Sequence, residues 1–155
     1  MALDDHIRIL SGVRLFEGFS LEQLRLLAFG AEAMRLPAGK RLYLEDDVAD
    51  SAYIVLRGNI RLFREHDGQN IEISVADSGS VLGEMALIAD TKRMTSADAA
   101  TDSEILRINR SMFLRILEEF PDTAEKLRSQ IIEDLQTLIR RIEQVGERLG
   151  YPPES

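Results

Sequence analysis

The chain contains no cysteine among its 155 residues. This absence excludes disulfide bonds, thiolate chemistry and iron–sulfur clusters held by the chain. It agrees with a cytoplasmic location, which we expect for this protein. The N-terminal segment carries Asp4, Asp5 and His6, so it does not form a secretory signal.

Histidine is scarce as well, since His6 and His66 are the only two. They are not spaced like metal ligands, and neither lies on a helix expected to be buried against a haem. The sequence shows no Ser-His-Asp arrangement, no nucleophile elbow and no glycine-rich loop that would cradle a triphosphate. We therefore predict that the chain is not an enzyme and that it needs no metal or cofactor.

Basic residues are in the minority, because 19 Lys and Arg stand against 27 Asp and Glu, for a formal net charge of −8. A nucleic-acid-binding surface would need a basic face. The pair Arg140-Arg141 is short and lies among acids, so it indicates only a solvated helix face. No apolar run is long enough to span a bilayer. We expect neither a nucleic acid nor a membrane as partner.

Helix and strand signals divide the chain into consecutive parts of one domain. Residues 1–31 are predicted to be helical, and Ser20 with Gln23 forms a capping box at the start of a helix. Residues 32–110 break into strands of about four to eight residues, separated by turn signals such as Gly58-Asn59. Short antiparallel strands at this close spacing predict a barrel or a jelly roll.

Residues 111–150 are predicted to be helical again, with Ser111 as the cap of a helix that ends before Pro121. A longer helix follows and ends near Gly150. Its apolar residues recur at coiled-coil spacing: Ile131, Leu135, Leu138, Ile142, Val145 and Leu149. We expect the second half of this helix to extend beyond the barrel, so the stripe predicts a homodimer. The alternative is an amphipathic helix that packs on its own barrel.

A glycine, a carboxylate and a guanidinium lie in one short segment. Glu84 can accept a hydrogen bond from a sugar hydroxyl, and Arg93 can pair with phosphate oxygens through its planar fork. Gly83 lets the backbone approach a ligand closely, and the N–H groups of Met85 and Ala86 can add donors. The alternative is a surface segment in which Glu84 and Arg93 only pair with each other.

The residues GEMALI at positions 83–88, followed by Arg93, Met94 and Thr95, resemble the phosphate-binding cassette of the cyclic nucleotide-binding domain family. Several separately placed motifs agree in order and spacing, so the resemblance is specific.

The resemblance extends over residues 15–120, and residues 36–40 and 53–62 look like the family's first turn and its early glycine hairpin. It implies a mostly β fold with flanking α-helices. We expect an antiparallel β jelly roll at 32–110 that contains the cassette at 83–95. Helices should precede it, and a long C-terminal helix should follow it as a lid and dimerisation element.

The resemblance also implies a role for each cassette residue. Glu84 would accept from the ribose 2′-hydroxyl, with Gly83 allowing close approach, and Arg93 would pair with the cyclic phosphate. Backbone amides would complete the ribose and phosphate contacts: those of Met85, Ala86, Met94 and Thr95.

Residues outside the cassette would hold the base. Ile73 and Ser74, on the strand before the cassette, fall where family members contact it. The C-terminal helix around Thr137, Leu138 and Arg141 would cover the base as a lid.

Three positions depart from the family pattern. Met94 stands where many bacterial members have Ser or Thr, and Thr95 would point away from the phosphate if the segment is extended. Leu138 stands where bacterial catabolite activators place a base-reading threonine, which weakens the expected base selectivity. Asp46 replaces a turn glycine, and Asp tolerates left-handed backbone better than most residues.

These features indicate a bacterial signal-transduction module that senses a cyclic nucleotide, cAMP in preference to cGMP, and couples binding to movement of the C-terminal helix. One alternative is a ligand-free scaffold for protein–protein contact, which Met94 and Leu138 favour. Another is the effector domain of a transcription regulator, although the acidic charge and the lack of a winged helix-turn-helix in this sequence speak against it.

Overall fold

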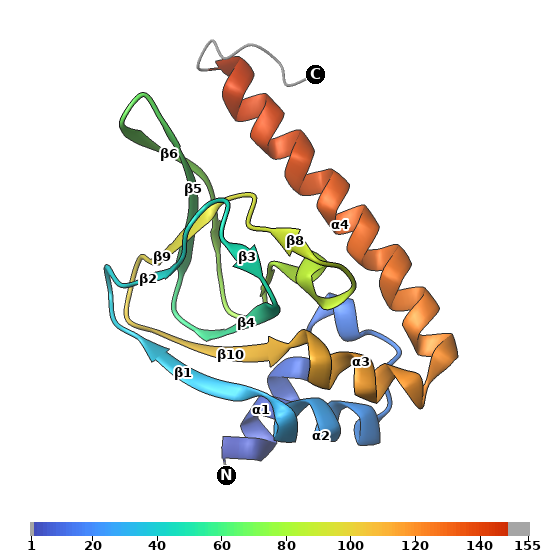
Figure 1. The fold of residues 1–155 in the computed structure, drawn as a ribbon. Coiled ribbons are helices and arrows are strands. Elements are labelled where there is room, and N and C mark those ends of the chain that lie inside the picture. Colours follow the sequence, from blue (N-terminus) through green and yellow to red (C-terminus); the bar gives the residue numbers. More distant parts are fainter. Residues whose placement is uncertain (1, 149–155) are drawn as a thin grey trace.

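The described residues, 2–148 of a computed structural model, form antiparallel sheets with helices gathered at one end and along one side (Figure 1). The helices are α1 (Ala2–Ser11), α2 (Leu21–Gly30), α3 (Arg110–Glu118) and α4 (Pro121–Arg148), with the short 3-10 helices η1 (Arg14–Phe16) and η2 (Glu84–Leu87). The strands are β1 (Glu32–Leu36), β2 (Arg41–Tyr43), β3 (Val48–Ala49), β4 (Ser51–Arg57), β5 (Ile60–His66), β6 (Gln69–Ala76), β7 (Val81–Leu82), β8 (Thr91–Lys92), β9 (Ser96–Ala99) and β10 (Ser103–Asn109).

The strands form two larger sheets and one small ribbon. One sheet has the order β1-β10-β4-β7 and the other has the order β2-β9-β5-β6, while β3 pairs with β8. All pairings among the described strands are antiparallel. Many neighbours in a sheet are distant in sequence, which is the crossed connectivity of a jelly roll. The predicted fold class is therefore confirmed.

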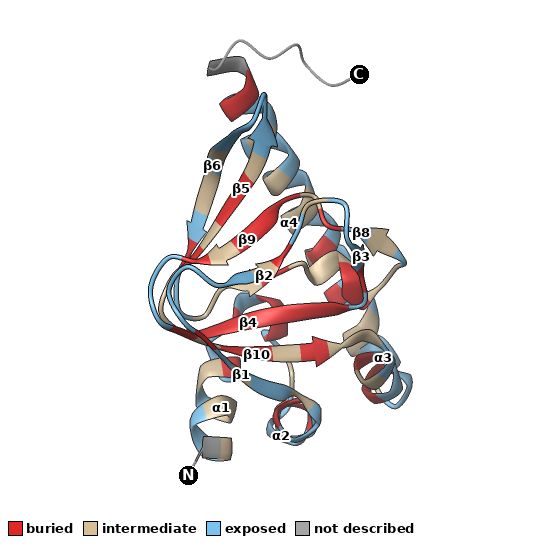
Figure 2. Cartoon of the chain, turned by 60° about the vertical axis from the view of Figure 1, so that its left-hand side comes forward, coloured by how far each residue is buried: buried red, intermediate tan, exposed pale blue. Residues whose placement is uncertain are grey.

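Two groups of buried apolar side chains hold this arrangement together. One group lies between the sheets and includes Val55 and Ile105, both fully buried. The other joins the helices to β4 and β10 and includes Leu27 and Phe113. Figure 2 shows β4 and β10 buried along most of their length, whereas the tip of the β5–β6 hairpin is exposed. The helix η2 packs against β4, so the cassette rests on the most buried strand of the fold.

Local signals in the sequence account for several element ends. The Ser20 hydroxyl accepts a hydrogen bond from the Gln23 amide over 3.1 Å, and the Gln23 side chain accepts one from the Ser20 amide over 2.7 Å. The predicted capping box is thus present. Asp46 adopts φ 71°, so the turn persists with Asp in place of glycine. The prediction that Ser111 caps α3 is wrong, because the side-chain Oδ1 of Asn109 accepts from the backbone amides of Ser111 and Met112 instead.

The long helix α4 begins at Pro121 and runs along the side of the barrel toward the β5–β6 hairpin (Figure 1). Ile131 is fully buried and Val145 is only 8% exposed. Ile131 belongs to the core that joins the helices to β4 and β10, so the first half of the apolar stripe packs on the chain's own barrel. That the second half of α4 extends beyond the barrel stays a prediction. Homodimerisation remains a prediction, and Leu149 and the predicted helix end near Gly150 lie outside the described residues.

Candidate functional site

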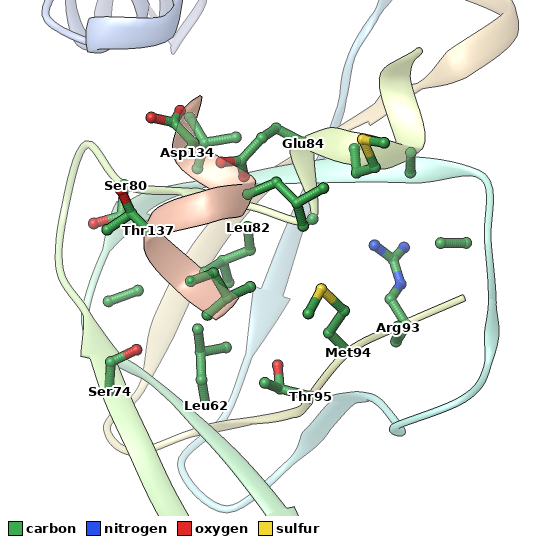
Figure 3. A pocket seen from close by; sticks show the side chains of 18 of the residues that line it. Leu62, Ser74, Ser80, Leu82, Glu84, Arg93, Met94, Thr95, Asp134 and Thr137 are labelled. Atoms are coloured by element: carbon green, nitrogen blue, oxygen red, sulfur yellow. The ribbon is translucent and has the colours of Figure 1, made fainter. Parts of the chain in front are cut away.

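A cavity of about 550 Å³ lies between the segment 83–95, strand β6 and the inner face of α4 (Figure 3). Most of the predicted site residues line it: Gly83, Glu84, Met85, Ala86, Arg93, Met94, Thr95, Ser74 and Leu138. These residues come from four separate parts of the chain, and the jelly roll brings them together. The size is in the usual range for a small-molecule site.

Ile73 is the predicted site residue that does not line the cavity. The register of β5 with β6 pairs Leu62 with Ser74 but Phe63 with Glu72, so Ile73 is the extra residue of a bulge. A bulge changes the direction of the side chains around it. The prediction for Ile73 is therefore wrong, and Leu62 and Val75 line the cavity on this side.

Gly83 has a backbone conformation that only glycine adopts easily. Its φ is +69°, and a Cβ atom at this position would clash with Nη1 of Arg93. The carbonyl of Gly83 accepts a hydrogen bond from the Ala86 amide over 3.0 Å, which starts the helix η2 directly at Glu84. The glycine therefore brings the cassette backbone and the guanidinium into close contact.

Arg93 is held rigidly although it is charged and only 6% exposed. Its Nη2 donates a hydrogen bond to the Ser51 carbonyl over 2.8 Å. Its Cζ lies 4.4 Å from the ring centroid of Tyr43 and 5.4 Å from that of Tyr53, and the two rings stack on each other at 5.9 Å. The prediction of a solvated surface pair with Glu84 does not fit a buried guanidinium fixed in this way.

The remaining terminal nitrogen of Arg93 carries the most informative feature of the site. Nη1 is the only buried side-chain nitrogen or oxygen of the described residues that has no hydrogen-bond partner. A buried donor without an acceptor costs about 1–3 kcal/mol, and more when it is charged. This nitrogen belongs to a side chain that lines the cavity, so an anion bound there would satisfy it.

Thr95 takes a direction that differs from the expected one. The chain bends at Met94 and Thr95 rather than running straight, and both side chains line the cavity (Figure 3). Thr95 is 3% exposed and lines the cavity together with Tyr43. Burial raises the pKa of Tyr43 to about 12, so this phenol stays neutral. The expectation that Thr95 points away depended on an extended segment and is wrong.

Glu84 faces the inner side of α4, where Asp134 lies next to it (Figure 3). Burial, and after it the neighbouring Asp134 carboxylate, raise the pKa of Glu84 to about 7. Sequence reasoning did not identify Asp134. The available signal was its position one helical turn before Leu138, on the face predicted to cover the ligand.

The family is shown by sequence comparison. The model of the cyclic nucleotide-binding domain matches residues 33–120. The chain therefore belongs to the cyclic nucleotide-binding domain family. Domains of this family are regulatory rather than catalytic, and their fold occurs in cAMP sensors and regulators.

Individual relatives agree with this assignment. The cyclic AMP receptor protein of Thermus thermophilus is 28% identical over 148 residues, which are 92% of this chain and 68% of the receptor. The solved structure of a cyclic nucleotide-binding-like protein from Brucella abortus is 55% identical with a TM-score of 0.69, over 74% of this chain and 99% of that one.

An enzyme also appears among the relatives, but only through a small part of its length. Lysophospholipase NTE1 of Mycosarcoma maydis is 31% identical over 74% of this chain, and this match covers 6% of the lysophospholipase. Within residues 2–148, no set of His, Asp and Glu side chains is grouped as metal ligands would be. Nor does any helix of this part have the length and apolar character that crossing a membrane requires.

Proposed function

We propose that this chain is a cyclic nucleotide sensor and that cAMP is its preferred ligand. The observation that carries the proposal is Nη1 of Arg93, a buried charged donor without a partner beside a cavity of about 550 Å³. A cyclic phosphate supplies one negative charge and two free oxygens, which suit a single guanidinium. The charge-assisted hydrogen bond would form where the low dielectric strengthens it.

The other contacts follow from the arrangement of the cavity. Glu84 would accept a hydrogen bond from the ribose 2′-hydroxyl, and the cassette backbone would approach the ribose at Gly83. The base would lie between Leu62 and Ser74 on one side and Leu138 on the other, all of which line the cavity. Apolar contact discriminates weakly between purines. We therefore expect the affinities for cAMP and cGMP to differ by less than about two orders of magnitude.

Coupling to α4 would follow from the contacts that the cassette makes with the C-terminal helices. Arg110, the first residue of α3, donates from Nη1 to the carbonyls of Ala89 over 2.6 Å and Ala86 over 3.3 Å, and from Nη2 to Asp90 over 2.6 Å. A shift of the cassette would thus be passed to α3 and, across the break at Pro121, to α4. Such movement of packed helices is a common form of ligand-driven switching.

The relatives support the ligand class. The Thermus thermophilus relative is named a cyclic AMP receptor protein, and the Brucella abortus relative is named cyclic nucleotide-binding-like. We infer a regulatory, non-enzymatic role in the cytoplasm of a bacterium, with no nucleic acid as partner of this part of the chain. A homodimer through α4 is part of the proposal, because Ile132 and Ile139 lie one heptad apart on α4 and are 44% and 37% exposed.

A ligand-free scaffold is the second candidate. Met94 favours it, because a thioether cannot donate a hydrogen bond to the phosphate. The rigid, unsatisfied Arg93 favours ligand binding, since a scaffold would gain nothing from a buried donor without an acceptor.

Calorimetric titration with cAMP, cGMP and a cyclic dinucleotide tests the proposal. Arg93→Ala should weaken cAMP binding at least about a hundredfold, which corresponds to about 3 kcal/mol. The matched control is Arg35→Ala, which removes an exposed arginine of β1 outside the cavity and should leave the affinity unchanged. Equal affinities of wild type and Arg93→Ala would contradict the proposal and favour the scaffold.

A further inference from the structure

Two carboxyl groups meet where α4 closes over the cassette. Glu84 comes from η2 and Asp134 from α4, and the two side chains lie next to each other at the cavity (Figure 3). Nε2 of Gln130, one turn earlier on α4, donates to Oδ1 of Asp134 over 2.9 Å. This bond fixes the orientation of Asp134 toward the cassette. Two neighbouring carboxylates in a partly buried place cannot both be ionised at low cost, so we expect the pair to hold one proton at acidic pH.

The surroundings do not relieve this repulsion. Asp134 is the charged side chain with the strongest effect on Glu84. The nearby cations have other partners or lie at the cavity edge, and they come from every element around the pair, with one phenol: Arg93 of the cassette, Lys92 of β8, Arg14 of η1, Arg141 of α4 and Tyr43 of β2. Arg93 donates a hydrogen bond to the Ser51 carbonyl, and Nη2 of Arg14 lies 3.6 Å from Oε1 of Glu133.

In this structure Asp134 of α4 therefore contacts the Glu84 carboxyl group, which is the same acceptor that a ribose hydroxyl would use. We propose that Asp134 competes with the ligand for Glu84, and that ligand binding releases the proton which the two carboxyls share. This inference rests on the proposed function. In the ligand-free chain the proton lies between Glu84 and Asp134. When a ligand hydroxyl donates to the Glu84 carboxylate, the proton passes to solvent and Asp134 becomes an ionised, separate side chain.

The proposal predicts how affinity depends on pH. The pKa of Glu84 is raised to about 7, so below this pH the pair is protonated and binding must release the proton. The dissociation constant should then rise about tenfold for each unit of pH below 7. Above that pH the pair has already lost its proton, and the affinity should level off.

The substitution Asp134→Asn removes the proton shared by the two carboxyl groups but keeps a contact between residue 134 and Glu84. The asparagine amide can donate a hydrogen bond to the Glu84 carboxylate without any shared proton. The contact between α4 and the cassette is therefore kept, while the proton shared with Asp134 is lost. The matched control is Glu143→Gln, which removes a carboxylate from an exposed position of the same helix.

The experiment is calorimetric titration with cAMP at about pH 5.5, 6.5, 7.5 and 8.5, in buffers of different ionisation enthalpy that report proton release. We expect release of close to one proton at the lowest pH for wild type and for Glu143→Gln, and a weaker pH dependence for Asp134→Asn, in which the burial of Glu84 remains but the repulsion by Asp134 is gone. The same pH dependence in Asp134→Asn as in wild type would overturn the proposal, as would a flat wild type.

A second measurement keeps this test separate from the proposed function. In ligand-free protein with ¹³C-labelled carboxyl groups, the Glu84 resonance should titrate near pH 7 in wild type and at a lower pH in Asp134→Asn, which keeps the burial of Glu84 but not the charge of Asp134. Absence of cAMP binding at every pH would contradict the proposed function, while this titration would still decide whether the pair exists. An ordinary pKa of Glu84 in ligand-free wild type would overturn the shared proton.

Discussion

Replacement of Glu84 by glutamine should stabilise the ligand-free protein at alkaline pH but not at acidic pH. The pKa of Glu84 rises from its ordinary value of 4.5 to about 7 on folding, first because of burial and then because of Asp134. The folded protein therefore binds more protons than the unfolded chain. The stabilising effect of the protonated group is complete below about pH 4.5 and is lost as the pH rises through about 7.

The size of the effect follows from the same values. A rise from 4.5 to about 7, at about 1.36 kcal/mol for each pH unit, corresponds to a loss of about 3 kcal/mol once the pH is above both values. This is an upper limit, because α4 can move away from the cassette and hydrate the two carboxylates. Glutamine is never charged and can still donate to Asp134, so Glu84→Gln avoids this loss. For a chain of this length the gain in melting temperature should be at most about 6–12 °C.

Urea unfolding followed by circular dichroism at about pH 5 and about pH 8 measures this difference. Glu84→Gln should match wild type at the lower pH and exceed it at the higher one, and Glu143→Gln should show no such change between the two. A stability difference between Glu84→Gln and wild type that is equal at both pH values would refute the reasoning. The Glu84→Gln variant should also lose cAMP affinity, because the carboxylate that lowers stability at alkaline pH is the acceptor that the ribose hydroxyl needs.

The remaining predictions concern the cassette backbone and assembly. Gly83→Ala should lower the free energy of unfolding by about 1–2 kcal/mol, because alanine at positive φ is strained. It should also weaken cAMP binding, because the added Cβ displaces Arg93. Unfolding and titration curves like those of wild type would contradict this prediction. Ile132→Asp, which lies outside the cavity, should convert a dimer to a monomer in sedimentation velocity without a change in cAMP affinity, and Ile139→Asp should also give a monomer. A wild-type chain that already sediments as a monomer would show that these two residues form no interface.

Several features could be predicted because they depend on neighbouring residues. The capping box of Ser20 and Gln23 is a pair of short-range hydrogen bonds, and the Gly58-Asn59 hairpin needs a residue with positive φ at one fixed place. The cassette is also continuous in sequence, so Gly83, Glu84 and Arg93 could be identified as one site before the structure was known.

Features that depend on contacts between distant segments could not be predicted in this way. The bulge at Ile73 arises from the pairing of β5 with β6, and Thr95 is buried at the cavity beside Tyr43, which is far away in the chain. The heptad pattern of α4 is equally compatible with a second copy and with the chain's own barrel. The first half of the pattern packs on the chain's own barrel, since Ile131 belongs to the core that joins the helices to β4 and β10.

The meeting of Glu84 with Asp134 shows the same division most clearly. Each residue alone is an ordinary carboxylate in the sequence, with an ordinary pKa in the unfolded chain. The fold buries Glu84 and brings it next to Asp134 across 50 positions of sequence. Desolvation and repulsion between like charges exist only in that arrangement, because both effects depend on three-dimensional distance and burial.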